Sequence, residues 1–223
     1  MLPSTENMLI KNSFYITYAF LMTTATITFI ESLRTKDLKI RNILSLETCI
    51  SVVATFFYSA FVNKLDTNTV EYDKINMMRY VDWSITTPIM LLVLLLALLY
   101  NNNGGSLNFF SFLGIVGLNY GMLGSGYLGE IGVLQKTVAN LFGFGFFSAM
   151  FYWIYAGYVK PKGNRDNWML FMIFLVLWAF YGIVYFMDNV TQNVSYNILD
   201  LFSKCFVGIF FWAYFTKVFT LKG

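Results

Sequence analysis

The amino-acid sequence predicts an all-α integral membrane protein, a seven-transmembrane-helix bundle with its N-terminus outside and its C-terminus in the cytoplasm. Of the 223 residues, 57% are hydrophobic and only 12% are charged, whereas charged residues make up about 25% of an average soluble domain. A helix that crosses a bilayer needs about 20 apolar residues. Seven such helices and their loops account for the whole chain, so we expect a single domain over residues 1–223.

Polar, Gly-rich or Asn-rich segments separate the apolar runs and place each helix in turn. The first expected helix, residues 13–33, ends at the charged segment RTKDLK, and the second, 41–62, ends at NKLDTNTVEYDK. The third, 76–100, ends at NNNGGS, and the fourth, 107–127, ends within the glycine-containing segment GSGYLGE. The fifth, 131–158, ends at KPKGNRDN, the sixth, 166–187, ends at DNVTQN, and the seventh covers 193–219.

The lysine and arginine content of the loops predicts the orientation, because cytoplasmic loops carry an excess of these residues. One side of the expected bundle carries Arg34, Lys36, Lys39, Arg41, Lys160, Lys162, Arg165, Lys217 and Lys222. The other side carries only Lys11, Lys64, Lys74 and Lys136, interleaved with Asp66, Glu71, Asp73 and Glu130. The first side is therefore expected in the cytoplasm.

The composition also argues against several classes of function. The chain has no histidine, and its two cysteines, Cys49 and Cys205, lie within apolar runs, so we expect neither a metal site nor a disulfide framework. The net charge of +3 is small and dispersed, which argues against binding to nucleic acid. We expect a protein that is not an enzyme, whose surroundings are a lipid bilayer and whose chemistry uses Asp, Glu, Lys, Arg and hydroxyl groups.

Four charged residues lie inside the expected helices, where each costs ~2.5–3.5 kcal/mol or more and therefore marks a function or a helix end. Lys204 is near the middle of the seventh helix, and Asp200 is one turn earlier on the same face. Arg79, Asp82 and Thr86 follow one face of the third helix. A lysine paired with an aspartate could simply neutralise a helix contact. A buried lysine that forms a Schiff base is the sharper hypothesis.

Glu47 is a fifth ionisable residue, about two turns inside the cytoplasmic end of the second helix. It could be a helix-end residue whose carboxylate reaches the membrane surface. It could instead be a buried carboxyl group with a role in transport. The sequence leaves both interpretations open.

Three segments resemble the microbial (type 1) rhodopsins, a family of seven-helix proteins that bind retinal. Residues 79–88 read RYVDWSITTP, which is very similar to the family's Arg-Tyr-x-Asp-Trp-x-x-Thr-Thr-Pro signature. Residues 200–204 read DLFSK, which matches the Asp-x-x-x-Lys of its retinal-binding segment. Residues 178–185 read WAFYGIVY, where the family usually has Trp-x-x-Tyr-Pro-x-x-Trp, so Gly182 and Tyr185 depart from the pattern.

The resemblance implies a cofactor and a role for each matching residue. Lys204 would bind all-trans retinal as a protonated Schiff base, with Asp82 and Asp200 as its counterion. Arg79 would separate that counterion from the outer surface, and Thr86 would bond to Asp82. The residues expected to line the retinal are Trp83, Thr87, Pro88, Met90, Trp178, Tyr181, Tyr185 and Ser203. Related proteins commonly form trimers or pentamers, so we expect a homo-oligomer.

The resemblance leaves the transported ion open between a proton and another small cation. The intact Asp82 and Thr86 pair favours a light-driven outward proton pump. Many family pumps carry a carboxylate eleven residues after this aspartate, where this chain has Val93, so Glu47 is the candidate replacement donor. A light-gated cation channel is the alternative, with a polar path that could include Ser13, Thr17, Thr24, Glu47, Asn193 and Asn197. The site that carries a second glutamate in channel relatives is Ala54 here, which argues against a channel.

Two further expectations follow from the resemblance. A photosensor that signals through a partner is a third and less favoured hypothesis. Compact loops, Val93 and Glu47 together point to the branch of the family encoded by giant viruses of algae.

Overall fold

The computed structural model describes residues 5–65, 72–102, 105–161 and 163–216. Within these residues there are seven helical spans that are long and apolar enough to cross a membrane, and no strand. The predicted multi-pass, all-α fold is therefore confirmed. Lys162, Lys217, Lys222, Asp66 and Glu71, which entered the prediction of orientation, lie outside the described residues.

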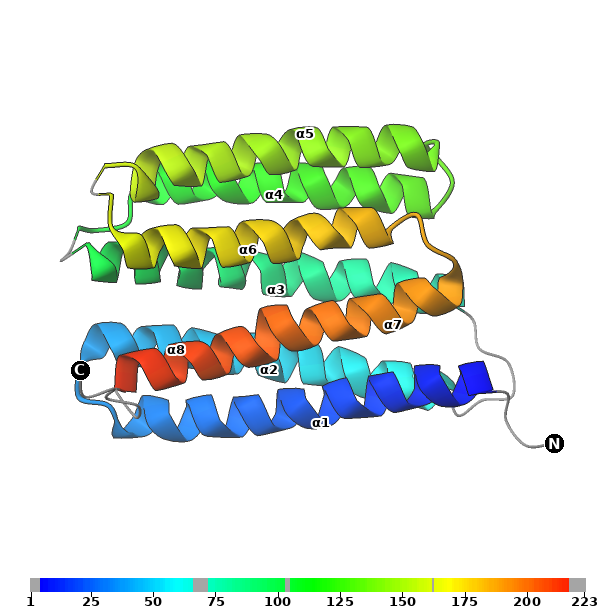
Figure 1. The fold of residues 1–223 in the computed structure, drawn as a ribbon, viewed down its shortest axis with the longest axis horizontal. Coiled ribbons are helices and arrows are strands. Elements are labelled where there is room, and N and C mark those ends of the chain that lie inside the picture. The colour runs from blue at the N-terminus through cyan, green and yellow to red at the C-terminus, as the bar shows by residue number, and fades with distance from the viewer. Residues whose placement is uncertain (1–4, 66–71, 103–104, 162, 217–223) are drawn as a thin grey trace.

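The helices follow one another with short connections (Figure 1). The first four spans are single α-helices, namely α1 (Thr5–Arg34), α2 (Leu38–Leu65), α3 (Tyr72–Asn101) and α4 (Phe109–Glu130). The fifth combines α5 (Lys136–Ile154) with the π-helix η1 (Tyr155–Val159), and the sixth is α6 (Arg165–Val184). The seventh consists of α7 (Asn189–Asp200), the π-helix η2 (Leu201–Phe206) and α8 (Val207–Thr216).

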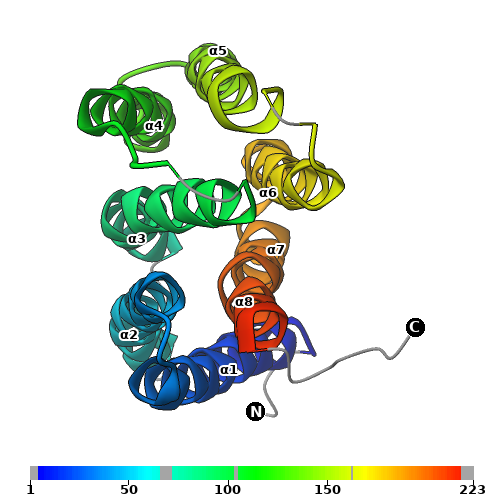
Figure 2. The ribbon, with the colours of Figure 1, turned by 90° about the vertical axis from the view of Figure 1, so that its left-hand side faces the viewer.

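The spans form a closed arrangement in which the first and last are neighbours (Figure 2). Helix α1 packs against α2 on one side and against α7, η2 and α8 on the other. Helix α3 is central, since it contacts α2, α4 and α6. Residues from the start and the end of the chain therefore share the interior with α3.

Five spans begin one to eight residues earlier than the apolar runs predict, and the first and seventh are two of them. Helix α1 begins at Thr5, eight residues before the expected start, because polar residues can extend a helix beyond the apolar part of a span. Helix α7 begins at Asn189, where the carboxylate of Asp188 accepts hydrogen bonds from the backbone amides of Val190 and Thr191 and so caps the helix.

The interior is apolar at the C-terminal half of α3 and polar at the middle of the bundle. Leu91, Val93, Leu94 and Leu98 have no exposed surface and form part of the main apolar core. The polar interior lies around η2, where the helix widens to the i→i+5 pattern over Leu201–Phe206. Such π-helical segments are frequent at functional sites, and this one contains Lys204.

Candidate functional site

Four charged side chains from α3, α7 and η2 meet at the centre of the bundle. Lys204 Nζ lies 2.7 Å from Asp82 Oδ2 and 3.5 Å from Asp200 Oδ2. Arg79 Nη1 lies 3.8 Å from Asp200 Oδ2. All four side chains are at most 1% exposed. Two cations therefore balance two anions in a buried cluster. A single unpaired charge buried at this position would carry a large desolvation cost.

The two aspartates of this cluster have different surroundings. Tyr181 donates a hydrogen bond of 2.7 Å to Asp200 Oδ1, and the hydroxyl of Tyr58 lies 2.8 Å from Asp200 Oδ2. Asp82 Oδ1, by contrast, is buried without a hydrogen-bond partner among the described residues. Thr86 donates to the backbone carbonyl of Asp82 at 2.9 Å rather than to its carboxylate. Both oxygens of Asp200 thus lie within hydrogen-bond reach of a tyrosine hydroxyl, whereas one oxygen of Asp82 has no partner among the described residues.

Aromatic rings, amides and a tyrosine hydroxyl hold Arg79 at one side of the cluster. Its guanidinium lies 5.1 Å from the ring centroids of both Phe14 and Phe61. Its Nη2 donates to Asn193 Oδ1 at 3.3 Å, and its Nη1 donates to the Tyr58 hydroxyl at 3.3 Å. Sequence reasoning placed Arg79 here but gave no role to Phe14 or Phe61, whose positions depend on the packing of α1 and α2 against α3.

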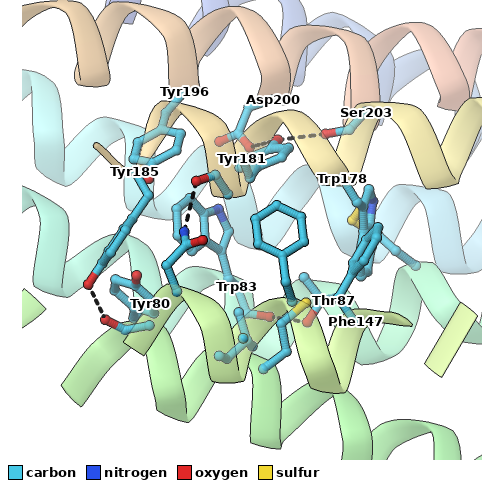
Figure 3. Close-up of a pocket in the computed structure, with 18 of the residues that line it drawn as sticks. Tyr80, Trp83, Thr87, Phe147, Trp178, Tyr181, Tyr185, Tyr196, Asp200 and Ser203 are labelled. Atoms are coloured by element: carbon cyan, nitrogen blue, oxygen red, sulfur yellow. Dashed lines mark hydrogen bonds between the residues drawn. The ribbon is translucent and has the colours of Figure 1, made fainter. Parts of the chain in front are cut away.

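A cavity leads from Lys204 between the helices (Figure 3). Trp83 and Trp178 come from α3 and α6, and Tyr181, Tyr185 and Ser203 also face it. Of the residues expected to line the retinal, Trp83, Thr87, Met90, Trp178, Tyr181, Tyr185 and Ser203 line this cavity. Pro88, the residue after Thr87 in α3, is not among the residues that line the cavity.

The lining fits a long apolar molecule with one reactive end. Most of the residues that form it are aromatic, aliphatic or glycine, and the amine at one end belongs to Lys204. The Ser203 and Tyr181 hydroxyls lie 2.9 Å apart beside that end. The amine can bond to an aldehyde carbon, and the rings can enclose a polyene such as retinal.

Residues of the fourth and fifth spans also line the cavity, and the sequence gave no sign of them. Phe144, Phe147 and Gly126 belong to this set. A Cβ atom on Gly182 would lie 2.6 Å from Phe144 Cζ, so the glycine leaves the space that the ring of Phe144 occupies. The departure from the family pattern at Gly182 is therefore matched by a bulky residue on α5.

Glu47 is buried rather than at the membrane surface. It is 2% exposed, and no cation lies within ion-pair distance of it among the described residues. A Cβ atom on Gly208 would lie 3.0 Å from Glu47 Oε2 and 3.0 Å from Thr24 Cγ2, so the carboxyl group fits against the bare backbone of α8. Its location excludes the interpretation as a helix-end residue that reaches the surface.

The side chain of Glu130 is also buried, at the C-terminal end of α4, although the sequence placed this residue in a loop region. Its side chain is 6% exposed. Asn76 donates to Glu130 Oε1 at 2.9 Å and accepts from Asn193 at 3.2 Å, and Asn193 in turn accepts from Arg79. Lys136 Nζ lies 3.7 Å from the other oxygen, Oε2. The contact joins residues 54 positions apart, which no local pattern could reveal.

Comparison with known proteins gives three kinds of match. Residues 9–218 match the family described as Bacteriorhodopsin-like protein. A green-light absorbing proteorhodopsin of Gamma-proteobacterium EBAC31A08 is 26% identical over 157 residues, which cover 63% of this chain and 61% of that protein. The chain thus spans about three fifths of the length of this curated relative.

Solved structures agree with this assignment. The crystal structure of viral rhodopsin OLPVRII is 57% identical, with a TM-score of 0.89, and the match covers 95% of this chain and 100% of that chain. Thermophilic rhodopsin, at 21% identity and a TM-score of 0.75 over 96% of each chain, shares the fold. The family match over nearly the whole chain, together with the buried lysine and its two aspartates, shows that this chain belongs to the bacteriorhodopsin-like family, the microbial rhodopsins.

Proposed function

We propose that this rhodopsin is a light-driven outward proton pump in which Lys204 holds all-trans retinal covalently through its side-chain nitrogen. Members of the family bind retinal at a lysine and transport ions in response to light. Bound retinal supplies light-driven isomerisation, which changes the position of the charge at the lysine nitrogen. The contact of 2.7 Å between Lys204 Nζ and Asp82 Oδ2 carries the proposal, because a proton on this nitrogen has an acceptor within hydrogen-bond reach.

The proposed roles of the two aspartates follow from their hydrogen bonds. Asp82 is the first proton acceptor, since its Oδ1 is free of any partner among the described residues. Asp200 remains an ion, because the hydroxyls of Tyr58 and Tyr181 stabilise its charged form. Arg79, on the outer side of both, keeps a positive charge beside the pair.

Glu47 is the proposed internal proton donor. Its side chain is buried, and no cation lies within ion-pair distance of it among the described residues. Burial favours the protonated form of a carboxyl group. The corresponding depth of α3 offers only apolar side chains, including Val93. On α2, Glu47 is therefore the buried carboxyl group that supplies the proton returning to Lys204 from the cytoplasmic half.

A light-gated cation channel is the second candidate. Buried hydroxyl residues on α1 favour it, because Thr17, Thr24 and Thr28 are at most 2% exposed and lie between α1 and its neighbours. Leu21, which has no exposed surface, interrupts the polar residues of α1. This interruption argues against a continuous polar path for cations. We therefore prefer the pump.

The proposal includes the orientation expected from the loops, with the N-terminus outside, and the association of copies in the bilayer that the resemblance implies. In this orientation Asp82 and Arg79 lie between Lys204 and the outer surface, since α3 begins on that side. A proton passed from Lys204 to Asp82 therefore moves outward.

A recording of photocurrent against voltage tests the proposal. Cells that express the chain with all-trans retinal should give an outward current that keeps its sign across the equilibrium potentials of the ions present. A current that reverses at the equilibrium potential of a cation would instead establish a channel.

A further inference from the structure

The buried face of α1 carries polar residues in two groups, with one apolar residue between them. Thr17 belongs to the outer group and Thr24 to the inner group, and both are at most 2% exposed. Leu21 occupies the same face one turn from each and has no exposed surface. On α1, Leu21 therefore separates the two polar groups.

The outer group is hydrogen-bonded to the charged cluster. Thr17 donates to the backbone carbonyl of Asn197 at 3.2 Å, and the Asn197 side chain donates to Ser13 at 2.8 Å. The Tyr58 hydroxyl lies 3.0 Å from Asn197 Oδ1 and 2.8 Å from Asp200 Oδ2. The outer group thus extends from α1 through α7 to the counter-charge of Lys204.

The inner group surrounds Glu47. Thr24 Cγ2 and Glu47 Oε2 both lie against Gly208 of α8, and Ser51 is one turn from Glu47 on α2. The hydroxyl oxygens of Thr24 and Ser51 are buried and have no hydrogen-bond partner among the described residues. Hydroxyls of this kind can be hydrogen-bonded by water, so the inner group can be hydrated.

An apolar layer lies between the two groups on both helices. Leu21 separates Thr17 from Thr24 on α1, and Ala54 separates Tyr58 from Ser51 on α2. Leu21, Ala54 and Cys205 have no exposed surface and belong to one apolar cluster. Seven residues of helix span about 10 Å, so the two groups are roughly two turns apart along each helix.

We propose that Leu21 and Ala54 form an apolar barrier that determines ion selectivity by preventing cations from passing along α1, α2 and η2. A hydrated cation on this route would have to lose its water beside Leu21, Ala54 and Cys205, and the weakly polar thiol of Cys205 is all that these three side chains offer in exchange. The outward step from Lys204 to Asp82 on α3 does not cross the layer. On the return from Glu47 only a proton, and no hydrated cation, has to cross it. The inference deepens the pump proposal and rests on it.

Polar substitution within the layer tests this inference. Leu21→Asn retains the approximate shape of leucine and adds polar atoms, and Ala54→Ser adds one hydroxyl. Each variant should form the pigment with all-trans retinal and then show, under light, a passive current whose reversal potential follows the sodium gradient. Leu21→Met, which stays apolar at similar volume, should give the wild-type current-voltage curve.

The two proposals fail in different measurements. The wild-type curve tests the pump, whereas the difference between each polar variant and the wild type tests the layer. If Leu21→Asn forms no pigment with retinal, the current-voltage curve of Ala54→Ser is the measurement that tests the layer. Curves from pigment-forming polar variants that superimpose on that of wild type would overturn the inference, and so would a passive current of equal size in Leu21→Met.

Discussion

At the scale of single residues, the function depends on how differently the bundle treats chemically identical side chains. Asp82 and Asp200 both contact Lys204, but only Asp200 has both oxygens engaged by tyrosine hydroxyls. Hydrogen bonds to the charged form of a carboxyl group favour that form. The aspartate with the free oxygen is therefore the better proton acceptor.

Lys204→Ala should abolish the visible absorption band. Lys204 is the lysine that lines the cavity, and alanine in its place has no amine that could bond to retinal. The measurement is the absorption spectrum after addition of all-trans retinal, with Lys64→Ala on α2 as the matched control that should keep the band. A visible band that survives in Lys204→Ala would refute the assignment.

Asp82→Asn should shift the visible band to the red and abolish proton transport. The substitution removes the negative charge 2.7 Å from Lys204 Nζ, which stabilises the cation in the dark. Absorption spectra and light-induced pH changes of the same preparation give both results. Normal transport by the variant would assign the first acceptor to another residue.

Glu47→Gln should slow the return of the proton to Lys204 on the order of 100-fold, within the range that a positioned proton donor contributes. Flash photolysis measures this step, and azide, a small mobile proton carrier, should restore its rate. Glu31→Gln, near the C-terminal end of α1, serves as the control and should leave the rate unchanged. An unaltered rate in Glu47→Gln would exclude the donor role.

The sequence identified the charged residues because a charge inside an apolar run is conspicuous. It could not show that Glu47 is buried, because that depends on Gly208 of α8 leaving space for the carboxyl group. It also could not show that Glu130 is bonded to Asn76, because the two residues lie on different helices. Contacts between distant segments require the packed structure.

At the scale of elements, helix ends and irregular turns position the site. The π-helix η2 carries Lys204, and the N-cap Asp188 fixes the start of the same span. Hydrogen bonds from the side chain and backbone of Thr191 lower the pKa of Asp188. A lowered pKa in the folded state means that this cap stabilises the protein above the unfolded-state pKa and loses that effect as the pH falls through the folded-state value.

Asp188→Asn should therefore reduce the loss of thermal stability on acidification. Asparagine caps a helix about as well as aspartate but does not ionise in this range. The unfolding temperature, followed by helical circular dichroism, should fall less for the variant than for the wild type between neutral pH and about pH 3. An equal fall for both proteins would show that the ionised cap does not contribute.

The apolar runs predicted the number of spans but not their internal irregularities. Helix α6 ends at Val184, three residues before the expected end at 187, and α7 begins four residues before 193. Hydrophobicity marks the part of a helix that lies in lipid, whereas caps and hydrogen bonds determine where the helix ends. The widening at η2 leaves no signature in the pattern of apolar residues.

At the scale of the whole molecule, the two sides of the bundle interior beyond Lys204 differ in polarity. The C-terminal half of α3 is apolar at Leu91, Val93, Leu94 and Leu98, whereas α1 and α2 carry the buried Thr24, Ser51 and Glu47. A returning proton would therefore approach Lys204 from the side of α1 and α2. In the proposed pump, Lys204 then passes the proton to Asp82.

The light-induced pH change of a suspension of cells that express the chain tests outward proton pumping most directly. With all-trans retinal present, illumination should acidify the medium, and a protonophore that makes the membrane permeable to protons should abolish the acidification. Lys204→Ala cells should give no signal. Alkalinisation of the medium, or no pH change from cells that contain the visible pigment, would contradict the account.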